Sequence, residues 1–586
     1  MAREPAVRER NPWLVLFALS VACLAGSLVA LAWVSFDAIS DGDPEIDGQA
    51  ADPGTGTVTP DISPGLTFAG ELPDGAQDLG LKPVADGKSP DIEFDYTGDT
   101  ADLVPISYLV PVASLGAGVD SLTSDQLKGI VRGEITDWGK VGGIPGKIHP
   151  LVGGSTNLQP SMEWAQRDGL VQVSGVFESV SADAFAQKMA LDSGGFGLVE
   201  LKDLRPNMVA LAIDGNDLAR GIGDPAAWPL TQHIAVIGRS SKGREQVPAI
   251  REHLAAQLPT ITRVVATGDV LQSRCSLAAI EATGDWGAAL RGPVGEYLSG
   301  ADLALSSLDG SIQGIGTPYL CVVQDYPNLT SPPEVIEALT LAGIDEMTLA
   351  TNHAFDCGLG ACGSKALLES QSRLNAAGIK TVGGGKNLED ALAPAIFEVH
   401  GIKFGVLGFD DIAAEDLEAT ADEPGTAPLD DSYANERADL PREPAFYKPA
   451  SLLGLERFQQ RIRALKTQVD VVIVQVQSGT EDTHTPSPRS IKALRAAVDA
   501  GADLVVGNQA HWVQAIEIRN DRFIALNDGS TIRNLQCVID QRQDTDGRQA
   551  ADTAGYPGQQ QIWQVRFNQI QDRLRQQHGL PPLRVL

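Results

Sequence analysis

The sequence is poor in basic residues and in cysteine. Lysine and arginine number 45 against 76 aspartates and glutamates, so the formal net charge is −31. A surface this acidic repels the phosphates of nucleic acids, and we therefore expect no nucleic-acid partner. Six cysteines in 586 residues exclude a small disulfide-dense fold. Hydrophobic residues make up 43% of the chain, which is enough for the packed cores of several domains and excludes general disorder.

The segment 13–36 contains no charged residue and no proline. At ~1.5 Å per helical residue, a segment of this length spans the ~30 Å hydrocarbon layer of a bilayer. Three arginines lie among the first ten residues, and no lysine or arginine follows before Lys82. This charge asymmetry predicts a cytoplasmic tail at 1–12, a single transmembrane helix at 13–36 and extracytoplasmic domains after it. A cleaved signal peptide is the alternative interpretation.

Residues 37–90 are predicted to form an acidic, flexible extracytoplasmic stalk. The stretch from Asp37 to Leu81 carries ten acidic residues and no basic one. Such a segment repels itself and cannot bury enough apolar surface to fold.

Residues 91–259 have a mixed α/β pattern. The alternation in 103–112 predicts a strand, and the sequence TSDQ at 123–126 predicts a capping box that opens a helix. The stretch SLTSDQLKGIVRGEITDWGKVGG (121–143) resembles the phosphate-type periplasmic solute-binding (PstS-like) proteins, as do the later stretches DSGGFGLVELKDL and WPLTQHIAVIG. The resemblance implies a small α/β domain that binds phosphate or a related anion through Ser155 and Thr156. Capping of a helix by one of these side chains is the alternative.

Residues 260–545 alternate between predicted strands and helices, which favours a layered α/β fold. A capping box is predicted at Ser331–Glu334. The acidic, proline-rich stretch 411–449 is interpreted as a loop. The chain then ends in a C-terminal extension, 546–586. In open α/β sheets, ligands bind outside the carboxyl ends of the strands. Polar residues follow the predicted strands of this region at Asp269, Asp309, Asn352, His353, Asp356, Gln477, Glu481 and His511.

These side chains point to metal chemistry. Carboxylate and amide oxygens and imidazole nitrogens suit Mn, Fe or Zn, often as a pair of ions that act on a phosphoester. His353 is then the candidate general acid, and Asp356 is expected to orient it.

Four motifs in this region resemble the CapA family of poly-γ-glutamate capsule-synthesis proteins. They are ATGDVLQSR (266–274), TNHAFDCG (351–358), the long stretch 374–409, and AVDAGADLVVGNQAHWVQAIEI (497–518). The resemblance implies a calcineurin-like metallophosphoesterase fold, a four-layer α/β sandwich with a metal site.

The resemblance also implies roles for individual residues. It puts Asp269, Asp309, Asn352, Gln477, Asn508 and His511 at metal-ligand positions, and His353, Asp356 and Arg274 at catalytic ones. This chain departs from the family pattern at three places: QSG (477–479) replaces HWG, GNQAH (507–511) replaces GHHPH, and SLD (307–309) replaces NLE. Because amides bind transition metals more weakly than imidazoles do, we expect a partly degenerate site from which the metal can have been lost.

Three functions follow from these features. The first is a membrane-anchored, extracytoplasmic CapA-like protein that works with the synthesis or export machinery of an anionic surface polymer. The second is an active metal-dependent phosphoesterase, and the third is a non-catalytic sensor of phosphate or a similar anion.

The cysteines outside the predicted anchor are expected to form disulfides, because an extracytoplasmic location permits them. Cys357 and Cys362 are flanked by glycines that allow a tight turn, so they are the first candidate pair. Cys275 and Cys321 are the second pair, which leaves Cys537 free. A soft-metal site at Cys357 and Cys362 is the alternative.

Overall fold

The computed structural model describes residues 62–532 except for 74, 97–102, 154–175, 206, 259–260, 271, 315–328, 358–361, 414–416, 430–454, 482 and 529. The chain divides into two compact units, Met1–Val58 and Thr59–Leu586, and every described residue lies in the second. The predicted anchor at 13–36 and the extension at 546–586 fall outside the described residues. Within the described ranges, no helix is both long and apolar enough to cross a bilayer.

Residues 62–258, here called the N-terminal part, are built around one nine-stranded sheet with the order β2-β1-β3-β11-β4-β8-β6-β7, in which β9 also pairs with β4. Its strands are β1 (Thr67–Ala69), β2 (Lys82–Pro83), β3 (Ile92–Asp95), β4 (Leu103–Ser114), β6 (His149–Gly153), β7 (Glu178–Val180), β8 (Gly195–Glu200), β9 (Met208–Ala210) and β11 (Thr231–Gly238). A separate pair joins β5 (Ser121–Leu122) and β10 (Ala212–Ile213).

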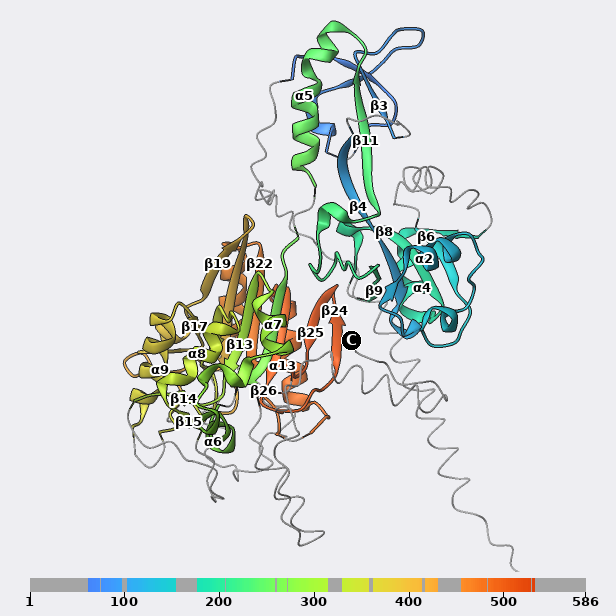
Figure 1. Ribbon diagram of the computed structural model, residues 1–586. Coiled ribbons are helices and arrows are strands. Elements are labelled where there is room, and N and C mark those ends of the chain that lie inside the picture. The colour runs from blue at the N-terminus through green and yellow to red at the C-terminus, as the bar shows by residue number, and fades with distance from the viewer. Residues whose placement is uncertain are drawn as a thin grey trace, which may run out of the picture. The chain divides into compact units, whose positions relative to one another are not determined.

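The helices of the N-terminal part are α2 (Ser124–Val131), α4 (Ala182–Leu191) and α5 (Ser241–Ala256), with short 3-10 helices η1 (Gln77–Leu79), η2 (Leu115–Ala117), η3 (Trp138–Val141), η4 (Leu201–Asp203) and η5 (Pro225–Ala227). The capping box predicted for α2 is present: the Thr123 side chain accepts from the backbone N–H of Gln126, and the Gln126 side chain accepts from that of Thr123. Helix α5 packs along β11 (Figure 1).

Residues 261–532, here called the C-terminal part, contain two larger sheets. The first has the order β17-β16-β13-β12-β26 and is parallel throughout; the second has the order β19-β20-β22-β23-β25-β24, with antiparallel edge strands. The strands are β12 (Val264–Val270), β13 (Leu303–Leu308), β16 (Glu346–Thr348), β17 (Lys380–Val382), β19 (Ala395–Val399), β20 (Ile402–Asp410), β22 (Val471–Gln477), β23 (Leu504–Asn508), β24 (Ile516–Arg519), β25 (Arg522–Ala525) and β26 (Ser530–Ile532).

Short strand pairs and helices complete the C-terminal part. The pairs join β14 (Ser311–Ile312) to β15 (Thr330–Ser331) and β18 (Gly384–Gly385) to β21 (Gly425–Thr426). The helices are α6 (Arg274–Thr283), η6 (Trp286–Leu290), α7 (Pro293–Ser299), η7 (Pro333–Val335), α8 (Ile336–Leu341), α9 (Ser364–Ala376), α10 (Leu388–Ala391), α12 (Glu456–Lys466) and α13 (Pro488–Asp499).

The alternation in β22, VVIVQVQ, shows how the layers pack. Val472, Val474 and Val476 lie in the apolar cluster that β22 shares with α12 and α13. Ile473 belongs to a second cluster, which contains residues of both sheets. Because successive side chains of a strand point to opposite faces, Gln475 and Gln477 face the other sheet. Gln475 confirms this direction, since its Nε2 donates to the carbonyl oxygen of Ser306 in β13 at 3.1 Å.

Three sequence expectations are wrong in detail. Ser331 caps no helix: it lies in β15, and its hydroxyl donates to the carbonyl oxygen of Gln272 at 2.5 Å. Asp269 lies inside β12 rather than after it. The predicted flexible stalk, 37–90, is folded from residue 62 onward: β1 and β2 lie within it, and Leu66 and Ala76 are 0% exposed. In each case a partner distant in sequence outweighs the local signal.

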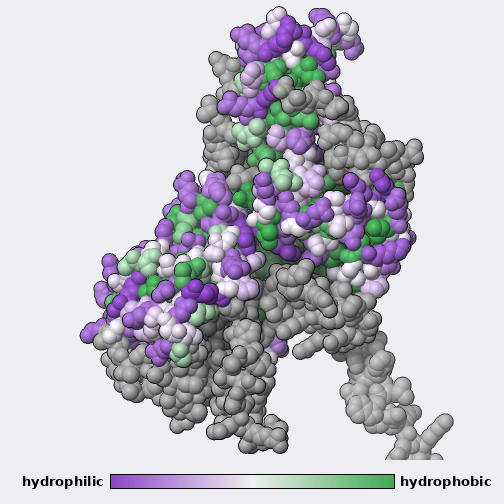
Figure 2. All heavy atoms as spheres, in the orientation of Figure 1, coloured by the Kyte–Doolittle hydropathy of each residue, from purple (hydrophilic) through white to green (hydrophobic). Residues whose placement is uncertain are grey.

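The described surface is mixed in character. On the face drawn in Figure 2, hydrophobic residues lie interspersed among hydrophilic ones. Large hydrophobic side chains that are exposed include Leu115, Leu191, Ile222, Leu341, Ile396 and Ile516.

Candidate metal centre

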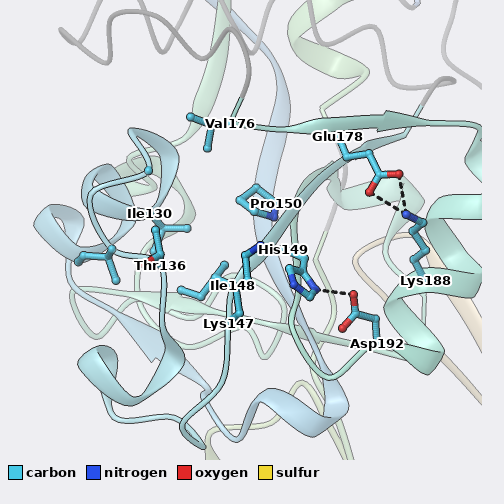
Figure 3. Close-up of a pocket in the computed structure, with 12 residues that line it drawn as sticks. Ile130, Thr136, Lys147, Ile148, His149, Pro150, Val176, Glu178, Lys188 and Asp192 are labelled. Atoms are coloured by element: carbon cyan, nitrogen blue, oxygen red, sulfur yellow. Dashed lines mark hydrogen bonds and ion pairs between the residues drawn. The ribbon is translucent and has the colours of Figure 1, made fainter.

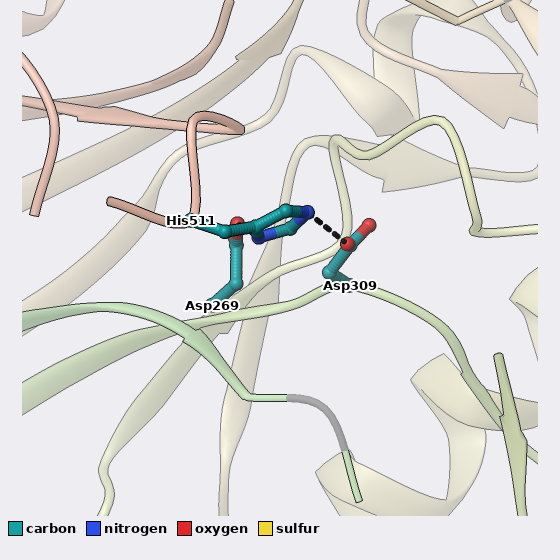
Figure 4. A group of neighbouring side chains, drawn as sticks. All are labelled: Asp269, Asp309 and His511. Carbon is teal, nitrogen blue, oxygen red and sulfur yellow. Dashed lines mark ion pairs between the residues drawn. The ribbon is translucent and has the colours of Figure 1, made fainter. Parts of the chain in front are cut away.

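Asp269, Asp309 and His511 converge in the C-terminal part. Each offers one ligand atom, and these atoms all lie within 4.8 Å of one another (Figure 4). Both aspartates are at most 1% exposed, and the His511 side chain is 11% exposed. A buried group of two carboxylates and one imidazole has the composition of a site for a divalent cation.

Strand register brings the three residues together. In the parallel pair of β12 and β13, Asp269 lies opposite Ser307, and Asp309 follows directly after β13. His511 comes from the other sheet, on the turn after β23. The backbone N–H of Gln509 in that turn donates to Asp269 Oδ2 at 3.3 Å, so one hydrogen bond links the ends of the two sheets.

The turn that carries His511 has an unusual backbone. Gln509 and His511 have φ angles of 96° and 53°, in the region that side-chain-bearing residues rarely adopt. Such conformations persist where the surrounding contacts impose them, and they are concentrated at functional sites. The turn therefore directs the His511 imidazole towards both aspartates, with Nδ1 3.2 Å from Asp269 Oδ2 and Nε2 3.7 Å from Asp309 Oδ2.

Electrostatics in this group favour a bound cation. Burial raises the pKa of Asp309; His353 and His511 oppose the rise, and the Asp269 carboxylate adds to it by repulsion. Burial lowers the pKa of His511, but its hydrogen bond to Asp269 and the nearby carboxylates outweigh this and raise the pKa to about 8. Neither carboxylate oxygen of Asp309 receives a hydrogen bond from a described residue. A divalent ion would relieve the repulsion and satisfy these oxygens.

Three further residues that the resemblance puts at ligand positions have a buried amide oxygen. Asn352 Oδ1, Gln477 Oε1 and Asn508 Oδ1 have no hydrogen-bond partner among the described residues. Buried polar atoms normally have one, and amide oxygens are suitable ligands for hard cations. The two carboxylates and the imidazole of the Asp269, Asp309 and His511 group fit a divalent metal, and amide oxygens of this kind are compatible with it. When bound, such an ion polarises a phosphoryl oxygen or lowers the pKa of a coordinated water.

His353 and Asp356 form a pair near these residues. His353 Nδ1 lies 2.7 Å from Asp356 Oδ2, and Asp356 Oδ2 also accepts from the backbone N–H of Leu329 at 2.5 Å. Burial lowers the pKa of His353, but Asp309 and Asp356 outweigh it and raise the pKa to about 9. The imidazole is therefore protonated at neutral pH, as a general acid requires.

Comparison with known proteins shows which family this part of the chain resembles. Residues 263–534 match the family described as "Bacterial capsule synthesis protein PGA_cap". This part of the chain belongs to the PGA_cap family.

Two curated relatives carry related names. The "Capsule biosynthesis protein CapA" of Bacillus anthracis is 26% identical over 205 residues, which cover 35% of this chain and 44% of the relative. The "PGA biosynthesis protein CapA" of Bacillus subtilis (strain 168) is 28% identical over 206 residues, which cover 35% and 47%. The matches thus span less than half the length of either relative.

One of the similar solved structures is an ABC-type phosphate transport receptor from Vibrio cholerae. It is 18% identical, covers 28% of this chain and 73% of its own, and has a TM-score of 0.24. A TM-score this low supports no conclusion about the fold or the function of either part of the chain.

The PGA_cap domain also contains the predicted disulfide. Cys357 and Cys362 are bonded, with their Cα atoms 5.8 Å apart. Because Cys357 directly follows Asp356, the bond restrains the chain next to the His353–Asp356 pair. The proposed partner of Cys275, Cys321, lies outside the described residues.

Not every predicted site residue can be placed. Ser155 and Thr156 fall outside the described residues, as does the side chain of Arg274, although its backbone begins α6. Conversely, Gln509 was not among the predicted site residues, although GNQAH (507–511) puts it where the family pattern GHHPH has histidine. Its importance depends on two side-chain hydrogen bonds that only the folded chain defines.

The N-terminal part contains an open cavity of about 530 Å³ beside β6 (Figure 3). Its lining includes two ion pairs, His149 Nδ1–Asp192 Oδ2 and Lys188 Nζ–Glu178 Oε1, each 2.7 Å long. Burial raises the pKa of Asp192, but hydrogen bonds from Gly194 and His149 outweigh it, so that the pKa is lowered overall. The lining therefore combines acidic side chains, Glu178 and Asp192, with basic ones, among them Lys147 and Lys188.

Proposed function

We propose that this chain is a CapA-like protein that acts outside the cytoplasm in the synthesis or export of an anionic capsule polymer of the poly-γ-glutamate type. The observation that carries the proposal is the PGA_cap match at 263–534, together with two relatives named for capsule and PGA biosynthesis. The two packed sheets with helices on their outer faces support the finer assignment of a calcineurin-like metallophosphoesterase fold.

The domain is proposed to hold a divalent metal (Mn, Fe or Zn) in a partly degenerate site. Asp269, Asp309 and His511 supply the charged and imidazole ligands. Gln477 and Asn508 occupy positions where the family pattern has histidine, so their amide oxygens would replace nitrogen ligands. The unpartnered oxygens of both side chains support this arrangement.

An extracytoplasmic location is proposed from the chain before the described residues. The apolar segment 13–36 would anchor the protein, and the acidic residues 37–61 would hold the domains away from the membrane. The disulfide between Cys357 and Cys362 supports an oxidising compartment.

Deletion of the encoding gene tests the role in polymer formation. We expect the deletion to abolish surface polymer, and the intact gene supplied in trans to restore it. Supplying Asp269→Asn instead tests the metal centre, since that substitution removes a charged ligand while keeping the shape of the side chain. Undiminished polymer in the deletion strain would refute the proposed role.

A metal-dependent phosphoesterase is the second candidate function. The observation that favours it is the protonated His353 held by Asp356 near Asp309. Hydrolysis of bis(p-nitrophenyl) phosphate by the purified full chain with Mn²⁺, lost in His353→Asn, would establish it. Polymer loss on deletion without any hydrolysis would leave the capsule role and exclude this activity.

A further inference from the structure

A chain of three side chains links the surface to the metal centre. Gln477 Nε2 donates to Gln509 Oε1 at 2.7 Å, and Gln509 Nε2 donates to Glu481 Oε1 at 3.0 Å. Gln477 and Gln509 are 1% and 3% exposed, whereas Glu481 is at the surface. We call these three residues the amide relay.

The chemistry of Glu481 sets the direction of the amide relay. A carboxylate only accepts hydrogen bonds, so Gln509 must turn its NH₂ group towards Glu481 and its oxygen towards Gln477. Gln477 must then turn its own NH₂ group towards Gln509. Its Oε1 is left on the opposite side, buried and without a hydrogen-bond donor among the described residues.

The amide relay is connected to the cation ligands through the backbone. The N–H of Gln509 donates to Asp269 Oδ2 at 3.3 Å. Gln477 and Asn508 lie opposite each other in the parallel pair of β22 and β23, and His511 follows on the same turn. The free oxygen of Gln477 is therefore at the ends of the strands that carry the metal ligands.

We propose that Glu481 and Gln509 are positioning residues that hold Gln477 Oε1 as an oxygen ligand and thereby set the metal preference of the site. This inference rests on the metal centre of the proposed function. With Gln477 so oriented, the proposed donor set consists of oxygen atoms from two carboxylates and three amides, together with a nitrogen atom from one imidazole. Oxygen ligands suit Mn²⁺, whereas imidazole ligands favour Zn²⁺. The amide relay therefore shifts the relative affinity towards Mn²⁺.

Metal affinities of the purified full chain in detergent test the proposal. Dissociation constants for Mn²⁺ and Zn²⁺ are measured by competition with a chelator. Glu481→Gln removes the constraint on direction, because an amide can either donate or accept, and we expect Mn²⁺ affinity to fall by about tenfold, the lower end for residues that orient metal ligands. Glu517→Gln, at an exposed ion pair with Arg495, is the matched control and should leave both constants unchanged.

Two further variants separate positioning from a general structural effect. In the double variant Glu481→Gln/Gln509→Glu, the carboxylate moves one step along the relay and again accepts from Gln477, so Mn²⁺ affinity should recover. Gln477→His replaces the oxygen with an imidazole and should shift the ratio of the two dissociation constants towards Zn²⁺ by about tenfold or more.

The outcomes distinguish failure of the metal centre from failure of the amide relay. A wild-type chain that binds neither ion would refute the metal centre itself. Metal binding that is unaffected by Glu481→Gln, or lost but not recovered in the double variant, would refute the amide relay while leaving the metal centre in place. An unchanged ratio of dissociation constants in Gln477→His would refute its effect on metal preference.

Discussion

Arg489 and Asp411 form an ion pair in the interior of the PGA_cap domain. Arg489 Nη2 lies 2.6 Å from Asp411 Oδ1, and Arg489 Nε lies 2.9 Å from both carboxylate oxygens. The side chains are 11% and 1% exposed. Asp411 also accepts from the Ser478 hydroxyl at 2.9 Å, so the pair supports the turn that follows Gln477.

Replacing Arg489 with methionine should therefore destabilise the domain strongly. The substitution leaves the Asp411 carboxylate buried without its cation, and breaking a buried pair in this way costs about 3–5 kcal/mol. Urea unfolding followed by hydrogen exchange in peptides from β20 and β22 measures the loss. Arg495→Met, at an exposed pair, is the control and should cost less than about 1 kcal/mol. Equal losses in the two variants would contradict the role assigned to the buried pair.

Glu346 should make stability fall with rising pH. It is 0% exposed, and burial raises its pKa well above the ordinary 4.5. Between these two values the folded protein keeps a proton that the unfolded chain has released. The free energy of unfolding contributed by this group is thus fully present below about pH 4.5 and falls as the pH rises through the folded pKa, by up to about 1.4 kcal/mol per pH unit.

Glu346→Gln should abolish this dependence, because the amide does not titrate. We expect the free energy of unfolding of the variant, relative to wild type, to increase between pH 5 and pH 8. Urea unfolding at several pH values measures the difference. If the difference in the free energy of unfolding between the two proteins stays constant from pH 5 to pH 8, Glu346 does not titrate in this range and the prediction is wrong.

Removing the Cys357–Cys362 disulfide should have a small effect on global stability. The bond closes a short loop, for which the chain-entropy relation gives about 2 kcal/mol. We expect the double variant Cys357→Ser/Cys362→Ser to lose no more than this, while hydrogen exchange rises in the peptide that contains His353 and Asp356. Peptide mapping under non-reducing conditions checks the linkage, and alkylation of both thiols in the oxidised protein would contradict it.

Asp356→Ala should loosen the segment around His353. Asp356 Oδ2 accepts from His353 Nδ1 and from the backbone N–H of Leu329, and hydrogen bonds to a charged group contribute about 1.5–3 kcal/mol each. We expect a loss of about 2 kcal/mol or more, with faster exchange of the Leu329 amide. Asp499→Ala, at an exposed pair with Arg519, should change stability by less than about 1 kcal/mol.

Short-range patterns in the sequence determined much of the architecture. The TSDQ signal places the start of α2, because both hydrogen bonds of its capping box are made within four residues. The alternation in β22 determines which of its side chains face the helices, since the strand period is set by the backbone itself. The position of polar residues at strand ends likewise located Asp309 and His511.

Only the tertiary structure decided how these residues meet. Asp269 and His511 belong to different sheets, and their 3.2 Å approach depends on strand register and on the packing of one sheet against the other. The role of Gln509 depends on two side-chain hydrogen bonds and a positive φ, none of which has a local sequence signature. Ser331 is an example of a local signal that the fold overrides. The sequence pattern predicts that its hydroxyl caps a helix, but in the structure the hydroxyl donates to the carbonyl oxygen of Gln272, which is distant in sequence. Contacts between residues far apart in sequence follow from the arrangement of the whole chain, and no short-range pattern encodes them.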